Sequence, residues 1–415
     1  MDPGGDPEGG TPVVKPSPTG LDRVVATDAR ITIGLLTSLA FLVSIDSRMI
    51  APLLPAIAAS LQTSVAGAGL MVSAYALPYG IFQIGYGPLA DRFGKIAVVR
   101  IAVLFFGVGT FGCGLAANLP TLTLLRIVTG AFAASVFPMT LAYIGDVVPM
   151  RQRQGAIGNL VTITSLATAL SPAAGGLIAS MLDWRDLFLV CGIATLAPTL
   201  LLFRVTSSPA RPARAAGWGG LFAPFGVVLR SRKALAIDVL VFVEGGLTSG
   251  ITYLGAYLHD DYRTGYARIG LLLGLYGVGT LATARVIGRL ARRYQSSRLV
   301  LVGAALMGVA YLALFGPREQ AWFAVAILGM GSGFMLCHST LQTRITEAVP
   351  ELRATAVALF AFSLFMGQGA GTAALGFLLN RFGYQAILVA CGAGFLLFAM
   401  AGAVVVATMI EDRLA

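Results

Sequence analysis

The chain has 415 residues, of which 57% are hydrophobic and only 12% are charged, about half the charged share of a typical soluble domain. A soluble protein of this length would need far more polar surface, so the composition excludes a soluble globular fold and indicates an integral membrane protein. The net charge of +10 does not require a nucleic-acid partner, and we expect none, because membrane proteins gather Lys and Arg in their cytoplasmic loops.

The polar stretch at the start of the chain, residues 1–29, is rich in Gly and Pro and has no apolar core followed by a cleavage site. We therefore expect no secretory signal peptide there and predict a disordered cytoplasmic tail, with a second short tail at 410–415. The four cysteines fall in apolar runs without the spacing of metal ligands. We expect them to be small hydrophobic residues, and we expect no metal and no cofactor.

Charged residues and turn residues divide the chain between these tails into twelve predicted helices. Each has an apolar run of about 18 residues or more, which is enough to cross about 30 Å of hydrocarbon. The predicted helices run over 31–59, 68–90, 96–116, 120–145, 154–180, 187–204, 234–258, 268–290, 298–316, 321–346, 354–379 and 384–409.

An even number of spans places both termini on the same side of the membrane. If that side is the cytoplasm, most of the 29 Lys and Arg residues lie in the tails and inner loops, which is the positive-inside bias. We therefore predict a multi-pass protein of the cytoplasmic (inner) membrane of a bacterium, with both termini in the cytoplasm. We expect it to be a monomer in the lipid bilayer.

The longest polar interruption, 205–233, is predicted to be a cytoplasmic linker between two bundles of six helices, over 30–204 and 234–409. The bundles repeat one another at an offset of about 201 residues. "GPLADRF" (87–93) meets "GRLARRY" (288–294), "DVVP" (146–149) meets "EAVP" (347–350), and Tyr75 meets Tyr276. The predicted fold is all-α, with twelve transmembrane helices in two pseudo-symmetric six-helix bundles. This architecture is associated with secondary transporters that bind their substrate between the halves.

Three ionisable residues lie deep in the first bundle, where each costs roughly 2.5–3.5 kcal/mol to insert and is a functional candidate by default. Asp46 lies in the outer half of its helix, and Arg126 enters from the outer side to a similar depth. We predict that they pair, either as a proton-coupling site or as a structural ion pair, and that Arg48 competes or extends outward.

Polar stripes on four other helices mark candidate substrate contacts. In 68–90, Tyr75, Tyr79 and Gln83 share a face suited to stacking and hydrogen bonding, although such a stripe is also common in ordinary packing. Glu244 heads a stripe with Thr248 and Thr252 that we expect to line the cavity, with Glu244 as a second proton carrier or the contact for a cationic substrate. Further candidates share a face of 321–346 or lie in 354–379. They are His338, Gln342 and Gln368. His338 is either simply hydrogen-bonded or handles protons or substrate.

The loop at 87–95, "GPLADRFGK", resembles the loop signature of the major facilitator superfamily, G-x-L-a-D-r-x-G-r/k. Four more segments are similar to patterns of that family. They are "DSRMIAPLLP" (46–55), "RIVTG" (126–130), "SPAAGG" (171–176) and "DWRDLF" (183–188). The resemblance covers nearly the whole chain from 30 to 409, and it points to the twelve-helix drug:proton antiporter branch. Three residues depart from the family's patterns, namely Ser171 in place of Gly, Arg48 in place of a small polar residue, and Arg292 in place of the acid of the second loop.

The resemblance favours interpreting the charged loop as a conformational latch rather than as a merely solvated loop. We expect Asp91 to face the N-terminal end of helix 354–379 in the other half, and Lys95 to pair with Asp146, when the halves close on the inner side. The latch residues are Gly87, Asp91, Arg92, Gly94, Lys95 and Asp146.

The resemblance also implies a packing motif in helix 154–180, made of Ser171, Pro172, Gly175 and Gly176. We expect this motif to bend the helix and to let it approach helix 268–290 closely near the outer side.

The leading functional hypothesis is a secondary transporter, not an enzyme, that exports small amphipathic molecules or drugs by alternating access in exchange for protons. Uptake or export of a specific sugar, organic acid or lipid by the same fold is the alternative. A membrane-embedded enzyme and a transport-dead sensor are hypotheses of other classes, and they are weak because no catalytic constellation is readable in the sequence.

Overall fold

The computed structural model describes residues 20–205, 218–316 and 319–410, and within them it contains helices and no strand. The first bundle comprises α1 (Gly20–Arg48), η1 (Ala51–Leu53), α2 (Leu54–Ser60), α3 (Val65–Phe93), α4 (Lys95–Gly114), α5 (Leu119–Ala133), α6 (Val136–Val147), α7 (Met150–Met181) and α8 (Trp184–Arg204). A separate helix, α9 (Trp218–Arg230), follows. The second bundle comprises α10 (Arg232–Thr248), α11 (Ile251–Asp260), α12 (Tyr266–Arg293), α13 (Ser296–Ala313), α14 (Gln320–Ala348), η2 (Pro350–Leu352), α15 (Arg353–Phe382), α16 (Tyr384–Val405) and η3 (Val406–Ile410).

Twelve helical segments in the described residues are long and apolar enough to cross a membrane, and this confirms the predicted fold class. Most of the segments extend a few residues beyond the predicted ends, whereas Lys95–Gly114 and Ser296–Ala313 stop short of the predicted ends at 116 and 316. The segment predicted over 68–90, for example, is helical over Val65–Phe93. The predicted disordered tail is wrong over 20–29, where α1 has already begun. Residues 1–19, 206–217 and 411–415 of the predicted tails and linker lie outside the described residues.

Local chemistry accounts for several helix ends. The side chain of Ser64 accepts a hydrogen bond from the Gly67 amide at the start of α3, and Asp183 and Asp186 form a capping box at the start of α8. These caps satisfy amide groups that the first turn of a helix leaves unpaired. Between α3 and α4, Gly94 has a φ of 88°, a conformation that glycine adopts without strain. The backbone conformation therefore explains why a glycine stands at this position of the loop signature.

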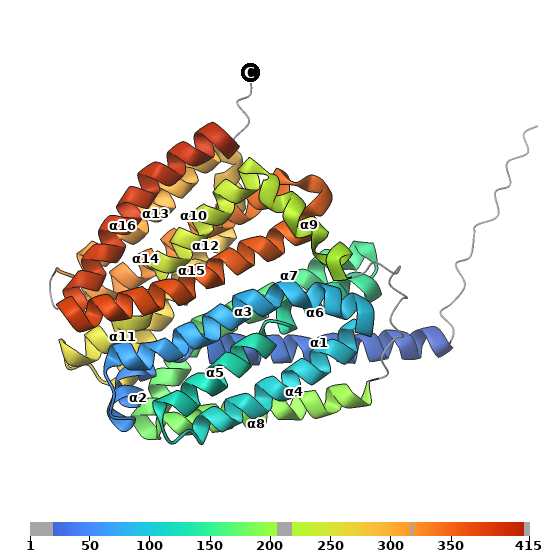
Figure 1. Ribbon diagram of the computed structural model, residues 1–415, viewed down its shortest axis with the longest axis horizontal. Coiled ribbons are helices and arrows are strands. Elements are labelled where there is room, and N and C mark those ends of the chain that lie inside the picture. The colour runs from blue at the N-terminus through green and yellow to red at the C-terminus, as the bar shows by residue number, and fades with distance from the viewer. Residues whose placement is uncertain (1–19, 206–217, 317–318, 411–415) are drawn as a thin grey trace, which may run out of the picture.

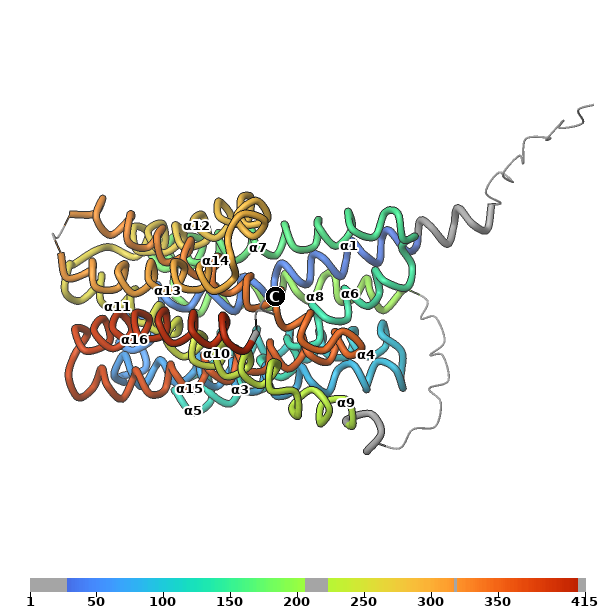
Figure 2. Tube along the Cα trace, turned by 90° about the horizontal axis from the view of Figure 1, so that it is seen from above, coloured from blue at the N-terminus to red at the C-terminus, as the bar shows by residue number. Residues whose placement is uncertain are grey.

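Two pairs of helices join the halves. α3 packs against α15 on one flank, and α7 packs against α12 on the other. Figure 2 shows these two contacts on opposite edges of the molecule. In Figure 1 the first half, blue to green, and the second half, yellow to red, lie close together on the left and diverge to the right. We call the diverging end, which carries α9 and the α3–α4 loop, the linker end, and the other end the far end.

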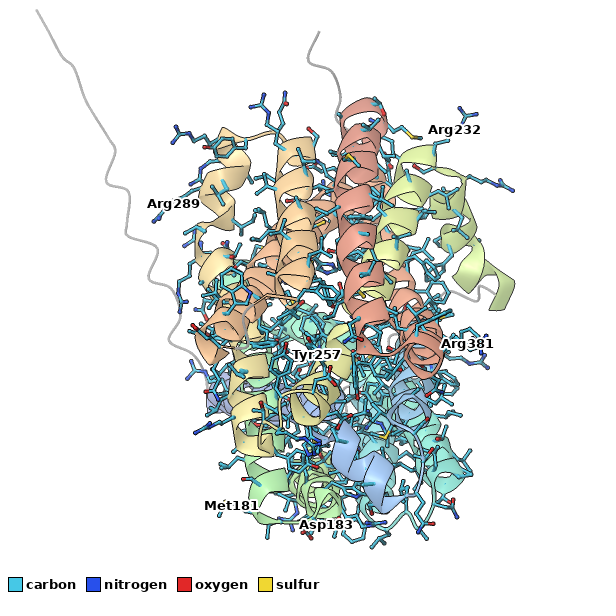
Figure 3. The ribbon with its side chains drawn as sticks, turned by 90° about the vertical axis from the view of Figure 1, so that its left-hand side faces the viewer. Met181, Asp183, Arg232, Tyr257, Arg289 and Arg381 are labelled. Carbon is cyan, nitrogen blue, oxygen red and sulfur yellow. The ribbon has the colours of Figure 1, made fainter. Side chains whose placement is uncertain are left out.

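The halves are in contact at the far end. A Cβ added at Gly255 of α11 would overlap the Ala51 carbonyl, and one added at Gly69 of α3 would overlap the Tyr253 ring. Figure 3 looks onto this end and shows Tyr257 of α11 at its centre, where the two halves meet. At the linker end, by contrast, nothing lies within 4 Å of a Cβ added at Gly87 or Gly158. The structure therefore has the far end closed and the linker end open.

Three of the spanning segments are broken, which the hydropathy pattern did not predict. The breaks fall between Arg48 and Ala51, at Ala134 and Ser135, and at Ser249 and Gly250. The first and third breaks are related by the internal repeat. Pro52, which has no amide proton to donate, lies just after the first break and offers a local cause.

Candidate functional site

A cavity of about 260 Å³ lies between the two halves. Both repeat-related helix breaks form part of its wall, at Ser47, Arg48 and Ala51 on one side and at Ser249 and Thr252 on the other. Such a pair of discontinuous helices near the middle of the bundle is a feature of transporter binding sites, because each break frees backbone groups for a ligand.

Asp46 and Arg126 form a buried ion pair beside this cavity. The Arg126 Nη1 atom donates a hydrogen bond of 2.7 Å to Asp46 Oδ2, and each side chain is 1% exposed. The predicted pairing is therefore present. Arg126 also lines the cavity, whereas Asp46 lies behind it. The other carboxylate oxygen, Asp46 Oδ1, is buried and has no hydrogen-bond partner among the described residues, so half of the acid group is available for a new partner.

Arg126 is held in place by aromatic rings as well as by Asp46. Its guanidinium lies 4.1 Å from the centre of the Tyr75 ring and 5.8 Å from that of Phe188. A guanidinium this close to a desolvated ring gains about 2 kcal/mol or more from the interaction. The arrangement fixes Arg126 between the acid and the cavity wall.

Arg48 points into the cavity, which corrects the expectation that it competes with Arg126 or extends outward. It stands in the last turn of α1 and lines the cavity. No described carboxylate forms an ion pair with it. The break after Arg48 sets this direction, and no pattern in the sequence shows it.

Two tyrosines related by the internal repeat face the cavity from opposite halves. Tyr75 and Tyr276 both line it, they are 4% and 6% exposed, and neither hydroxyl has a hydrogen-bond partner among the described residues. Their backbones are packed in the same way, since Gly130 lies against the Tyr75 carbonyl and Gly331 against the Tyr276 carbonyl. Sequence analysis noted the match of the two tyrosines but did not propose Tyr276 as a site residue.

The remaining tyrosine and glutamine candidates divide between the cavity and its surroundings. Tyr79 and Gln368 line the cavity, and the Tyr79 ring stacks at 4.0 Å on Phe365 of the other half. Gln83 is half-buried and does not line the cavity. Phe365, a wall residue, was missed because one more phenylalanine in an apolar helix gives no signal.

Glu244 does not line the cavity, contrary to the expectation from its polar stripe. It is fully buried, and its Oε2 atom lies 3.0 Å from Nδ1 of His338 on α14. The imidazole is stacked at 4.8 Å on Phe334. Thr248, from the same stripe, does line the cavity, whereas Gln342 is exposed elsewhere on α14. The stripe failed as a guide because Glu244 is turned toward His338 of α14, a contact between residues far apart in the chain.

The motif in α7 packs closely against α12 in the far half of the molecule. A Cβ at Gly176 would overlap the Tyr266 carbonyl and lie within 3 Å of Gly270 Cα. Ser171, the residue that departs from the family pattern, donates a hydrogen bond of 2.5 Å to the Ile45 carbonyl of α1. Pro172 lines the cavity. The expected close approach of these two helices is therefore present.

The charged loop, residues 87–95, lies at the linker end, where the two halves diverge. Lys95 forms the expected ion pair with Asp146, which joins α4 to α6 within one half. The pair is present although the halves diverge at this end, so the expectation that it depends on their closure is wrong. Asp91 and Arg92 are exposed, and Asp91 has no ion pair with a described residue. Among the described residues no group of three or more His, Cys, Asp or Glu side chains could hold a metal ion.

Comparison with known proteins gives a consistent picture. The family model of the Major Facilitator Superfamily matches residues 36–372 and 237–413. The "Uncharacterized MFS-type transporter YceJ" of Bacillus subtilis is 28% identical over 351 residues, which cover 83% of this chain and 88% of the relative. A "Probable sugar efflux transporter" of Helicobacter pylori (strain G27) is 28% identical over 326 residues, or 77% of this chain and 81% of the relative.

Two solved structures share the fold. The nucleoside transporter NupG has a TM-score of 0.74 at 14% identity and covers 89% of this chain and 98% of its own. The xylose transporter XylE from E. coli, in a partially occluded inward open conformation, has a TM-score of 0.73 at 15% identity and covers 94% of this chain and 99% of its own. At these identities the likeness shows the arrangement of helices alone.

Proposed function

The chain belongs to the Major Facilitator Superfamily, and on that premise we propose that it exports a small organic molecule across a bacterial cytoplasmic membrane in exchange for protons. The observation that carries the proposal is the buried Asp46–Arg126 pair directly behind a cavity that both halves line. We propose transport by alternating access rather than catalysis, with the lipid bilayer, the cargo and protons as the partners of the chain.

The proposed cycle moves the two halves about the central cavity. The two halves contact one another at the far end and diverge toward the linker end in this structure. Most of the Lys and Arg residues belong to the linker end, and the positive-inside rule supports assigning that end to the cytoplasm. The cargo then enters from the cytoplasm and leaves when the contacts of α7 with α12 and of α11 with η1 separate.

The proposed coupling step is a change of partner at Asp46. While Arg126 holds the acid, the carboxylate is stabilised in its charged form; when Arg126 turns toward cargo in the cavity, the isolated carboxylate binds a proton instead. Asp46 therefore takes up and releases one proton in each cycle. Arg126 is suited to this role because it contacts the acid and the cavity at the same time.

The volume of the cavity favours a metabolite-sized cargo over a bulky drug. At about 260 Å³ it lies just below the usual range of roughly 300–1,000 Å³ for drug-sized ligands. The Helicobacter pylori relative named for sugar efflux is consistent with export of a small metabolite. Export of amphipathic drugs remains the second candidate, and it is supported by the aromatic wall at Tyr79 and Phe365.

The test is substrate-driven proton movement in proteoliposomes that contain the full chain. We expect Asp46→Asn to abolish uphill transport and proton movement while substrate still binds. The matched control is Asp238→Asn, which neutralises another buried acid, 5% exposed, that does not line the cavity; it should transport like the wild type. If Asp46→Asn moves protons with substrate at the wild-type ratio, Asp46 is not the coupling site.

A further inference from the structure

We propose that the cargo of the central cavity is an organic anion, whose carboxylate or equivalent acid group is bound by Arg48. This inference rests on the proposed transport function and names its substrate class. It begins from the charges of the cavity wall: among the described residues that line it, the charged side chains are Arg48 and Arg126, and both are cations.

The two cations are not equivalent. Arg126 is already neutralised by Asp46 at 2.7 Å, whereas Arg48 has no ion pair with a described carboxylate. The acid in the second half that was expected to face the cavity, Glu244, is fully buried against His338. The wall therefore carries one uncompensated positive charge at membrane depth, where an unpaired charge is costly and an anionic ligand would relieve it.

The hydrogen-bonding groups around Arg48 suit the same ligand. Tyr276 and Arg48 line the cavity together, and the Arg48 side chain interacts with the Tyr276 hydroxyl. The hydroxyl of Tyr75, from the other half, is buried, lines the cavity and has no hydrogen-bond partner among the described residues. A planar guanidinium and two hydroxyl donors, one from each half, can together bind the oxygens of one carboxylate.

The other wall residues determine which apolar group can be attached to the acid group of the cargo. Tyr79 stacks on Phe365 at 4.0 Å across the halves, which offers an aromatic surface to a ring or a short apolar chain. The cavity of about 260 Å³ accommodates a ligand of one ring. A small aromatic carboxylate matches both the charge and the surface, and a cation is disfavoured because it would face Arg48 without a counter-charge.

The experiment measures ligand stabilisation of the purified full chain in detergent, because a ligand that binds the folded state raises the Tm. The probes are benzoate, salicylate and 3-phenylpropionate, each compared with its own neutral amide. For the wild type we expect at least one carboxylate to bind tenfold or more tightly than its amide. Arg48→Gln should abolish that preference, and Arg48→Lys should retain part of it. Arg381→Gln, which removes an exposed Arg at the far end of α15, should behave like the wild type.

Three results would overturn the inference: no carboxylate stabilises the protein, carboxylate and amide bind equally, or Arg48→Gln keeps the preference. This binding assay needs neither a membrane nor a proton gradient, so its outcome is independent of the coupling test on Asp46. If the protein prefers carboxylates but transports nothing, the proposed transport function is wrong and the anion site stands. If it transports only neutral molecules in exchange for protons, the proposed organic-anion cargo is wrong and the transport function stands.

Discussion

Two buried acids in this protein have partners of different chemistry. Asp46 is held by a guanidinium, which stays charged at any physiological pH, whereas Glu244 is held by an imidazole. The first pair lies directly behind the cavity wall, whereas neither member of the second lines the cavity.

The Glu244–His338 pair should behave as a unit in mutants. With Glu244 fully buried and His338 at 3.0 Å, removing either partner leaves the other unsatisfied in an apolar setting. We expect Glu244→Gln and His338→Gln each to lower the free energy of unfolding, and the double variant to lose little more than either alone. A double-mutant cycle in detergent should give a coupling of about 1–3 kcal/mol. Additive losses would mean that the two side chains do not interact.

Arg126 should not tolerate Lys. A lysine can reach Asp46, but it lacks the planar group that lies over the Tyr75 ring at 4.1 Å and the second donor edge that faces the cavity. We expect Arg126→Lys to lower the rate of uphill transport at least tenfold while the Tm falls by only a few degrees. Arg344→Lys is the matched control, because Arg344 pairs with Glu347 within α14, away from the cavity. Equal transport by Arg126→Lys and the wild type would reduce the pair to a structural role.

Among the helices, α7 packs tightly against α12 of the other half in one part of its length only. In its far half it lies against α12 so closely that Gly176 has no room for a side chain, while near the linker end nothing lies within 4 Å of a Cβ at Gly158. Small residues permit such backbone contact in membranes, where there is little hydrophobic force to hold helices together. The contact can therefore be separated without unfolding either helix.

Gly176→Leu should hold the far end open. The leucine would collide with the Tyr266 carbonyl and Gly270 and push α7 away from α12. We expect single cysteines placed in the cavity wall to be labelled faster by a membrane-impermeant reagent added from the far side. Gly158→Leu, in the same helix but in open space, is the control and should leave labelling unchanged. If both variants are labelled like the wild type, the contact does not close this end.

For the whole molecule, the ion pair that Lys95 of the charged loop forms with Asp146 lies within one half. Lys95 and Asp146 fasten α4 to α6, while Asp91 is exposed at the open linker end. A bond between Asp91 and the start of α15 can form only when the linker ends approach one another. We therefore propose that the latch is an interaction of the opposite state, and its loss should change the populations of the two states rather than the cavity.

Asp91→Asn should slow cycling without weakening binding. We expect the transport rate to fall at least tenfold, while the affinity of the purified protein for the transported substrate stays within about twofold, since no cavity residue changes. The control is Asp28→Asn, which removes an exposed acid from α1. A transport rate equal to that of the wild type would leave the loop as a solvated connection with no latch.

The spans, the repeat and the depth of the ionisable residues could all be predicted from the amino-acid sequence. Each span must contain enough apolar residues to cross the bilayer, so hydropathy and turn residues locate it within a few positions. The similar depth of Asp46 and Arg126 in the membrane also predicted their ion pair, because two opposite charges at the same depth of one bundle have few other partners. Lys95 and Asp146 could be paired because both were expected at the inner ends of their helices.

The tertiary structure was needed to find which side chains face the cavity. It showed that Arg48 and Tyr276 line the wall, that Glu244 turns away to His338, and that the segments break after Arg48 and Thr248. In water, the polar face of a helix marks its exposed side, but lipid is as apolar as the protein interior, so the pattern along a membrane helix distinguishes its faces poorly. The direction of each side chain here depends on how two bundles pack against one another and where a helix is interrupted, and both are contacts between residues far apart in the chain.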